Sequence, residues 1–318
     1  MLSCFKCNNN SIIDVNKSIN DIKISKNLHK IFLKNIKDNN NCFNIDIYNP
    51  KNIMNSNTAK LYKITVCNNS YTCKKYLIKD KDESEIKLIK REIKNLKHLT
   101  KHPSKYLPYL CASIENNKHI YIFYDYINGI DLFELVKNNY SIIKKNHNLL
   151  DIIYNILMAL HELFKANLAH LDLKPENIIV NNFSPIRLKL IDFECAHDIR
   201  KTQLTRPVGT IGYSSPEITL HNRYYYNSDI WSLGCIIYFL MTKKELFHCK
   251  NIDIFVRQLS VFKCIDHLDK TKYHFDIFSD EMYDLIKKML SSCHYTRISI
   301  TNILKSNLMK TYLKQISS

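Results

Sequence analysis

Long apolar runs are missing from this sequence, and glycine is rare in it. No apolar run approaches the roughly 18 residues that a membrane-spanning helix requires, and residues 1–10 contain no apolar stretch of the kind that a secretory signal has. We therefore expect neither a membrane span nor a secretory signal. The 318 residues include only four glycines. A loop that approaches a ligand closely therefore has few glycines available, although glycine is the residue that adopts positive φ without steric cost.

A disulfide framework is not indicated either. Eleven cysteines are scattered singly along the chain, and an odd number in a chain of this size suits a reducing compartment better than disulfide bonds. We expect the cytoplasm as the default compartment, and the sequence leaves nuclear entry open. It gives no indication of the oligomeric state.

Arginine is scarce despite the strong positive charge. The formal net charge is +16, but only seven of the 46 basic residues are arginine, and the lysines are spread along the whole chain. A surface built to bind nucleic acid would favour the forked guanidinium group of arginine. We therefore expect a solvated lysine-rich surface rather than a nucleic-acid partner, and a preference for acidic substrates stays open.

The most informative stretch runs from Ala169 to Val180 and ends in an apolar strand. A short polar turn follows, and then a second apolar run, 187–191, which leads into Asp192. Two apolar runs separated by a polar turn that contains proline predict a β-hairpin. Folding this hairpin about its turn places Asn177 beside Asp192.

The residues at the open end of this hairpin suit phosphoryl transfer. The side chains of Asn177 and Asp192 offer oxygen ligands of the kind that Mg²⁺ prefers. Asp172 and Lys174 face the same place, so a base, a cation and a metal seat come together. These are the parts that phosphoryl transfer needs.

The same stretch resembles the catalytic loop of the eukaryotic protein kinase superfamily, H-R-D-L-K-P-E-N, with Leu171 in place of the usual Arg. Asp192-Phe193-Glu194 is similar to the metal-binding D-F-G, with Glu194 in place of Gly. Three further matches follow in the order expected for serine/threonine kinases: Gly209 to Glu217 resembles G-T-x-x-Y-x-x-P-E, Asp229 to Gly234 resembles D-x-W-S-x-G, and Arg297 matches a late arginine that pairs with Glu217.

The resemblance implies an α+β, bilobal protein-kinase-like fold. A small, mainly antiparallel β lobe with one key helix would span about 45–125, and a larger, mainly α-helical lobe about 130–312. The kinase domain would thus cover 45–312. Residues 1–44 read as a low-complexity N-terminal extension that is either flexible or contains a short helix.

In the small lobe we expect strands at 45–48, 60–66 and 76–79. Apolar residues at helical spacing predict an amphipathic helix over 83–99, with Glu92 at the edge of its apolar stripe. By resemblance, Lys79 is the strand lysine of V-A-I-K that holds the α- and β-phosphates, and it pairs with Glu92. Leu77 then occupies the Ala position and faces the adenine.

The expected nucleotide contacts depart from the family at the Gly-rich loop. That loop falls on Met54 to Ala59 and contains none of the three glycines, which puts nucleotide affinity in doubt more than the chemistry. The resemblance assigns nucleotide contacts to Met54, Ala59 and Leu61 here, and to Asp125, Ile127 and Asp131 at and just after the hinge.

Two functions follow from the resemblance. An active Ser/Thr kinase would use ATP with Mg²⁺ or Mn²⁺ to phosphorylate protein hydroxyls. Asp172 would act as the base, Lys174 would neutralise the γ-phosphate, and Asn177 and Asp192 would hold the metal. The alternative is a pseudokinase that binds nucleotide or acts as a scaffold, as suggested by the missing glycines, Leu77, Leu171 and Glu194. His170 is expected to be structural, and the incomplete basic pocket at Leu171 predicts weak dependence on loop phosphorylation.

Overall fold

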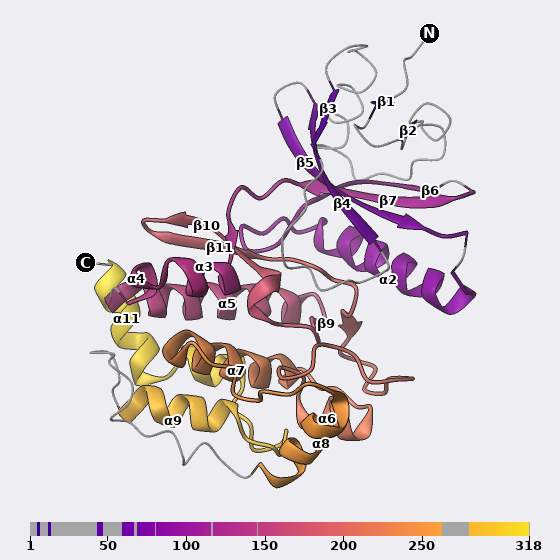
Figure 1. Ribbon diagram of the computed structural model, residues 1–318. Helices are drawn as coiled ribbons and strands as arrows, with labels where there is room; N and C mark the ends of the chain where they lie inside the picture. Colours follow the sequence, from indigo (N-terminus) through magenta and orange to yellow (C-terminus); the bar gives the residue numbers. More distant parts are fainter. Residues whose placement is uncertain are drawn as a thin grey trace. The chain divides into compact units, whose positions relative to one another are not determined.

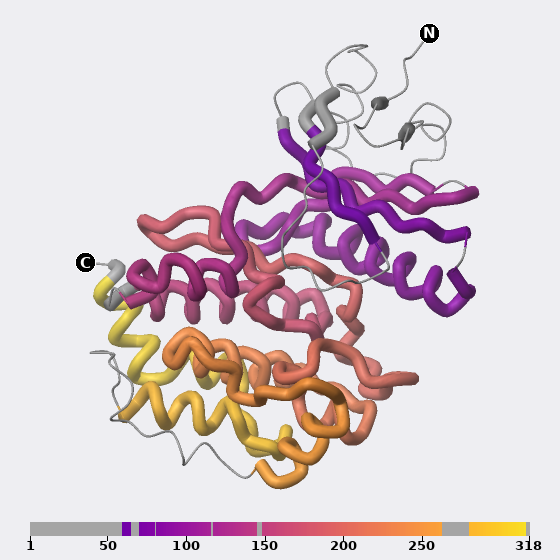
Figure 2. The backbone as a smooth tube through the Cα atoms, viewed as in Figure 1, coloured from indigo at the N-terminus to yellow at the C-terminus, as the bar shows by residue number. Residues whose placement is uncertain are grey.

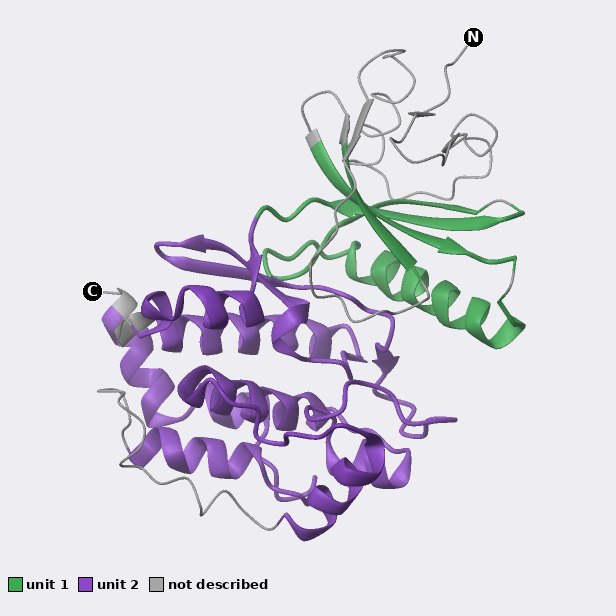
Figure 3. Ribbon diagram, viewed as in Figure 1, with its two compact units in different colours: residues 1–128 green, residues 129–318 purple. Residues whose placement is uncertain are grey.

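The computed structural model describes residues 59–262, with gaps at 67–68, 80, 116 and 145, and residues 280–317 (Figure 2). It also describes the backbone of three short strands nearer the N-terminus. The described chain divides into two compact units, Met1–Asn128 and Gly129–Ser318 (Figure 3). Residues 54–58 of the predicted Gly-rich loop, which include Met54, and most of the predicted N-terminal extension lie outside the described residues, whereas Ala59 begins β4.

The first unit is built on a five-stranded sheet in the order β3-β4-β5-β7-β6 (Figure 1), and all its strand pairs are antiparallel. The strands are β3 (Phe43–Asp46), β4 (Ala59–Val66), β5 (Asn69–Leu77), β6 (Leu110–Glu115) and β7 (His119–Asp125). Two shorter strands, β1 (Phe5–Lys6) and β2 (Ile12–Ile13), pair with each other. The predicted strand at 60–66 is confirmed. The prediction of a strand at 76–79 is wrong at its end, because β5 begins earlier and stops at Leu77.

Helix α2 (Glu83–Leu99) has the bounds that the sequence predicts. It begins with a capping box, in which the Asp82 carboxylate accepts from the backbone N–H of Glu85 and the Glu85 side chain accepts from that of Asp82. Such a box satisfies two of the backbone donors that a helix leaves unpaired at its start. The helix buries Ile89, Leu96 and Leu99 along one face, so that face holds α2 in the first unit.

The second unit is mainly helical. Its helices are α3 (Leu132–Asn138), α4 (Tyr140–Ile143), α5 (Asn146–Lys165), α6 (Pro216–His221), α7 (Ser228–Thr242), α8 (Ile252–Val261), α9 (Asp280–Met289), α10 (Ile300–Leu304) and α11 (Asn307–Ser317). The centre of the core is formed by α5 and α7, whose side chains Ile152, Ile156 and Trp231 are fully buried. Apolar residues on nearly every face of the stretch 149–167 predict a buried helix before the catalytic loop, and α5 confirms it.

Short strands position the functional loops of this unit. The predicted hairpin is present as β10 (Ile178–Phe183) and β11 (Ile186–Leu190), and β8 (Ile130–Asp131) adds to its edge. β9 (Leu168–Ala169) pairs with β12 (His197–Asp198), and the turn η2 (Pro175–Asn177) leads into β10. In the part of the chain that the structure describes, no helix combines the length and apolar character needed to cross a membrane.

Candidate active site

A buried carboxylate holds the catalytic-loop backbone in an unusual conformation. Leu171 has φ = +62°, a value that is rare for a bulky residue and costs of order 1–3 kcal/mol. Asp229 of α7 compensates, because Oδ2 accepts from the N–H of His170 at 2.7 Å and Oδ1 from that of Leu171 at 2.8 Å. The resemblance of 229–234 to D-x-W-S-x-G implies that Asp229 braces the catalytic-loop backbone, and these two hydrogen bonds confirm it. Its effect is to fix the direction in which the next residue, Asp172, leaves the backbone.

Asp172 lies in a small network of polar side chains. Thr210 Oγ1 donates to Asp172 Oδ1 at 2.6 Å, and Lys174 Nζ donates to Thr210 Oγ1 at 2.8 Å. Lys174 Nζ also lies 3.5 Å from Asp172 Oδ2. Thr210 therefore ties the carboxylate and the ammonium group together. These two side chains keep 14% and 20% of their surface exposed, enough for a bound substrate to reach them.

Asn177 joins this network from the start of the hairpin. Its Nδ2 donates to the backbone oxygen of Asp172 at 2.8 Å and to Asp172 Oδ2 at 3.2 Å. These bonds fix the amide so that Oδ1 is the atom left for a cation. The Ile191 N–H donates to the backbone oxygen of Asn177 at 2.8 Å. The hairpin therefore brings Asp192, the next residue, close to Asn177, as predicted.

A side-chain amide oxygen beside a carboxylate fits Mg²⁺, which binds one or two protein oxygens and completes its coordination with water and phosphate. Asp192 has φ = +64°, a conformation that Asp tolerates better than most residues. Next to it, burial raises the pKa of Cys195 to about 12. That thiol is therefore protonated near neutral pH.

His170 is a packed structural residue, as predicted. It is fully buried, and its Nε2 lies 3.0 Å from the Ile191 oxygen. Its ring meets the ring of Phe193 edge to face, with centroids 5.1 Å apart. These contacts connect the catalytic loop to the segment that begins at Asp192. They leave His170 without access to a substrate.

The first unit carries a buried ion pair that corrects one sequence prediction. Glu92 of α2 is 2% exposed, and its Oε1 accepts from Lys74 Nζ at 3.0 Å, not from Lys79. Its Oε2 accepts from the hydroxyl of Tyr76 at 2.6 Å. The prediction that Lys79 pairs with Glu92 is therefore wrong.

The physical reason is where β5 ends. Lys74 and Tyr76 are two residues apart in the strand and share the face that α2 covers. Lys79 lies beyond the strand, in an exposed turn. Leu77, which was predicted to face the adenine, is 48% exposed at the strand end. With Lys74 as the lysine of V-A-I-K, the Ala position lies two residues earlier, so Thr72 occupies it rather than Leu77.

The register of the sheet places two of the other predicted contacts. Leu61 lies opposite Lys74, and Ala59 lies opposite Tyr76. Directly opposite residues in an antiparallel pair point to the same face, so Ala59 and Leu61 line the face that carries the ion pair. These two positions become nucleotide contacts if Lys74 does.

The remaining predicted residues lie at the end of β7 and in the stretch of chain that follows it. The Asp125 carboxylate accepts from the backbone N–H of Tyr109 at 2.5 Å, and Ile127 follows as a partly buried residue outside the strands. Asp131 caps α3, accepting from the N–H of Glu134 at 2.8 Å. Burial raises the pKa of Asp131. Its cap role occupies at least one oxygen of the carboxylate to which the resemblance assigns a nucleotide contact.

Leu171 belongs to an apolar cluster that includes the loop after Asp192. It packs with four other buried side chains, from the loop, the neighbouring strand, α6 and the segment after α6: Ala169, Leu204, Ile218 and Tyr224. Gly209 has φ = +91°, and a Cβ there would lie 2.5 Å from the Leu171 oxygen. Leu171 thus forms apolar packing where the family's arginine would contribute to a basic pocket. Gly209 occupies a position at which any side chain would clash with the backbone.

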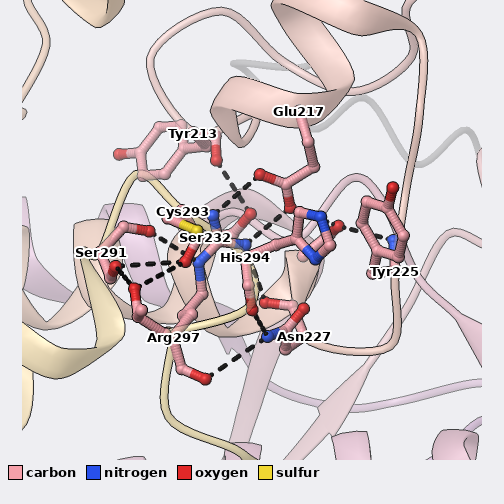
Figure 4. Close-up of polar contacts among 11 residues, drawn as sticks. Tyr213, Glu217, Tyr225, Asn227, Ser232, Ser291, Cys293, His294 and Arg297 are labelled. Carbon is pink, nitrogen blue, oxygen red and sulfur yellow. Dashed lines mark hydrogen bonds and ion pairs between the residues drawn. The ribbon is translucent and has the colours of Figure 1, made fainter.

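Glu217 and Arg297 form the second predicted pair, which is confirmed (Figure 4). Arg297 Nη1 donates to Glu217 Oε1 at 2.6 Å and Nη2 donates to Oε2 at 2.8 Å. Ser228 Oγ also donates to Glu217 at 2.7 Å. Burial opposes ionisation of Glu217, but the hydrogen bonds and charge of Arg297 outweigh it and hold the pKa of Glu217 below its ordinary value.

Comparison with known proteins agrees with this geometry. The model of the protein kinase domain family matches residues 51–309. Among curated relatives, serine/threonine-protein kinase cds1 of Schizosaccharomyces pombe is 32% identical over 263 residues, which cover 78% of this chain and 53% of that protein. Serine/threonine-protein kinase Nek1 of Mus musculus is 32% identical over 196 residues, 61% of this chain and 16% of that protein.

The chain belongs to the eukaryotic protein kinase superfamily, and its relatives place it with the serine/threonine type. Calcium-dependent protein kinase 4 of Plasmodium falciparum is a further relative, 31% identical over 62% of this chain and 36% of that protein. The chain spans about half the length, or less, of these curated relatives.

Sequence reasoning missed three residues of the site: Lys74, Tyr76 and Thr210. The run Tyr71-Thr72-Cys73-Lys74 has the alternation of a strand, and its final lysine was the available signal for the first. Thr210 was recognised only as part of a motif. Its bridge between Asp172 and Lys174 joins positions that are 38 and 36 residues apart.

Proposed function

We propose that this chain is an ATP-dependent protein serine/threonine kinase domain that transfers the γ-phosphate to protein hydroxyl groups. The observation that carries the proposal is the bonded set of Asp172, Thr210, Lys174 and Asn177. It holds a carboxylate, an ammonium group and an amide oxygen at one place. Catalysis of phosphoryl transfer depends mainly on such positioning and on electrostatic stabilisation.

Asp172 orients the substrate hydroxyl and accepts its proton as the phosphoryl group arrives. A positioned base of this kind contributes about 10²–10⁴-fold. Lys174 neutralises charge on the γ-phosphoryl oxygens. Thr210 donates its only hydrogen to Asp172 while accepting from Lys174, so it keeps both groups in place without competing for the proton.

Asn177 Oδ1 and Asp192 supply the protein oxygens for Mg²⁺ or Mn²⁺. The bound metal ion would neutralise phosphate charge during transfer. In the first unit, Lys74 takes the role that the sequence assigned to Lys79, namely binding of the α- and β-phosphates. Glu92 accepts a hydrogen bond from its ammonium group, and the Tyr76 hydroxyl donates to the other oxygen of Glu92. Ala59 and Leu61 offer apolar contacts on the same face.

The test is transfer of labelled γ-phosphate from Mg²⁺- or Mn²⁺-ATP to a generic basic protein. We expect Asp172→Asn to abolish transfer, with a loss of at least about 10³-fold. Thr210→Val should lower kcat by roughly 10- to 100-fold because the bridge is lost, and Thr210→Ser should retain most of the activity.

Transfer that persists in Asp172→Asn would refute the assigned base. No transfer by the wild type, with ATP still raising the melting temperature, would identify a pseudokinase that binds nucleotide. No transfer and no ATP binding would leave a scaffold function.

A further inference from the structure

A pocket of about 410 Å³ lies in the second unit and is lined by none of the catalytic residues. It is formed where the end of α6, the segment that follows it and the turn before α10 meet. The lining residues are Glu217, His221, Arg223, Tyr225, His294 and Tyr295. Its volume is several times what an inorganic anion fills and is enough for a whole amino-acid side chain.

Among the residues that the structure describes, no carboxylate is paired with the positive charge of Arg223 at this pocket. Glu217 is its one carboxylate, and Arg297 already neutralises it through two hydrogen bonds; the two side chains are 5% and 0% exposed. Arg223 is exposed, and its guanidinium makes no hydrogen bond or ion pair with any residue that the structure describes. His221 is likewise exposed at the end of α6. An anionic ligand would therefore find donors that no described carboxylate already occupies.

One wall of the pocket is aromatic. The rings of Tyr225 and His294 stack with centroids 3.6 Å apart and planes within 9° (Figure 4). Tyr295 leans against His294, with centroids 3.9 Å apart, and it is 85% exposed. Burial lowers the pKa of His294, so its ring is neutral near neutral pH and packs between the rings of Tyr225 and Tyr295.

The wall is held in place before any ligand arrives. Asn227 Nδ2 donates to the His294 oxygen at 2.6 Å, and the Tyr225 N–H donates to Ser228 Oγ at 3.0 Å. Backbone N–H groups of Thr296 and Arg297 donate to the Cys293 oxygen at 3.2 and 3.1 Å. A preformed wall lowers the entropic cost of binding.

We propose that this pocket binds a phosphotyrosine side chain of a protein or peptide partner. The phenyl ring would lie against the aromatic wall of Tyr225, His294 and Tyr295, of which Tyr295 is the most exposed, since aromatic rings gain from offset or tilted contact beyond simple burial. The phosphate would be bound by Arg223, whose fork matches phosphate oxygens bidentately, and by His221. A carboxylate or a phosphoserine would leave the aromatic wall unused. The proposal does not depend on transfer activity.

The test uses the full chain without ATP and a fluorescein-labelled Gly/Ser peptide that contains one phosphotyrosine. Fluorescence polarisation is read at physiological salt. Matched peptides carry tyrosine, phosphoserine or glutamate at the same position. We expect saturable binding of the phosphotyrosine peptide only, with phenyl phosphate as a competitor better than inorganic phosphate.

Two variants and one matched control locate the binding. Arg223→Gln should weaken binding at least about tenfold because the charge-assisted bonds are lost. Tyr295→Ala should weaken it about three- to tenfold through lost ring contact. Arg187→Gln removes an exposed arginine of β11 that does not line the pocket, and it should bind like the wild type.

Three outcomes would overturn the proposal. One is no saturable binding up to about 1 mM peptide, weaker than any useful recognition. A second is an equal loss in Arg223→Gln and Arg187→Gln, which would reveal general charge attraction to this basic chain. The third is equal binding of the phosphoserine or glutamate peptide, which would mean a simple anion site without aromatic recognition.

Discussion

Lys74, Lys75 and Lys79 are the same residue type within six positions, and only their surroundings distinguish them. Lys74 is 7% exposed and bonded to Glu92, whereas Lys79 is exposed in a turn. A buried ammonium group is stable only where a partner compensates for its lost hydration. Lys74 is therefore the lysine whose side chain the fold holds in one position.

Lys74→Met should reduce phosphate transfer at least about 100-fold, because it removes the charge proposed to bind the phosphates. It should also destabilise the first unit by up to roughly 3–5 kcal/mol, since the buried Glu92 loses its partner. Lys79→Met is the matched control and should change neither quantity appreciably. Transfer rates and urea unfolding of the three proteins measure both effects.

The double variant Lys74→Met/Glu92→Gln separates the two effects. Removing both charges should recover much of the stability, because no unpaired charge stays buried. Transfer should stay low. If Lys79→Met lost activity and Lys74→Met kept it, the sequence assignment would be right and the structural one wrong.

At the scale of elements, the segment from Asp192 to Glu217 is ordered mainly by apolar packing and backbone bonds. Leu204 is 6% exposed and belongs to the cluster around Leu171. The Leu204 N–H donates to the Asn222 oxygen at 2.8 Å, and the Tyr224 N–H donates to the Thr202 oxygen at 3.0 Å. These contacts need no phosphate, which agrees with the weak dependence on phosphorylation that Leu171 predicts.

Two adjacent residues of that segment provide the second prediction. Leu204→Ala should cost about 2–5 kcal/mol of local order through cavity formation, speed hydrogen exchange over 200–208 and lower transfer. Thr205→Ala, at an exposed neighbour, should lower transfer by less than about tenfold. A hundredfold loss in Thr205→Ala would show that a loop phosphate is needed after all.

At the scale of the molecule, the pair Glu217–Arg297 joins segments 80 residues apart in the second unit. Arg297 also lies over the ring of Trp231 in α7, with its guanidinium carbon 5.4 Å from the ring centroid. One ion pair thus connects α6, α7 and the segment before α10. Its energetics belong to the folding of the whole unit rather than to one helix.

The pH dependence of stability is the third prediction. The folded pKa of Glu217 is below its ordinary value of 4.5, so the unfolded chain takes up the proton first. The stabilisation is therefore complete above about pH 4.5 and is lost as the pH falls through the lower, folded pKa. Urea unfolding between pH 7 and pH 3 should show this loss in the wild type.

Variants of the pair provide the control. Arg297→Met leaves a buried carboxylate unpaired and should cost roughly 3–5 kcal/mol at neutral pH, with part of that loss relieved on acidification. The double variant Glu217→Gln/Arg297→Met should be more stable than Arg297→Met and should lack the acid-dependent loss. Identical acid dependence in the wild type and the double variant would contradict the role given to Glu217.

Much of the second unit follows from local pattern. The hairpin after Asn177, the buried helix before the catalytic loop and the partners Asp229 and Arg297 were all predicted correctly. In each case the chemistry-bearing residues lie within a few positions of a recognisable apolar run, or belong to a motif of fixed spacing. Local periodicity and spacing are properties of the chain itself, so they can be recognised without a structure.

Only the tertiary structure decided three points. These are which lysine pairs with Glu92, that Thr210 bridges Asp172 and Lys174, and that Asp131 caps α3. The missing loop glycines leave no reference point from which to count residues to the strand lysine. The sequence pattern therefore does not distinguish Lys74, Lys75 and Lys79. Which one is buried depends on the register of β5 against β4 and on the face that α2 covers. The family and the catalytic loop could be identified from the sequence, because the residues of each motif are close neighbours in the chain. The burial of Lys74 against Glu92, the apolar packing around Leu171 and the pocket with the aromatic wall could be found only in the fold. Burial and charge pairing depend on residues that are far apart in sequence.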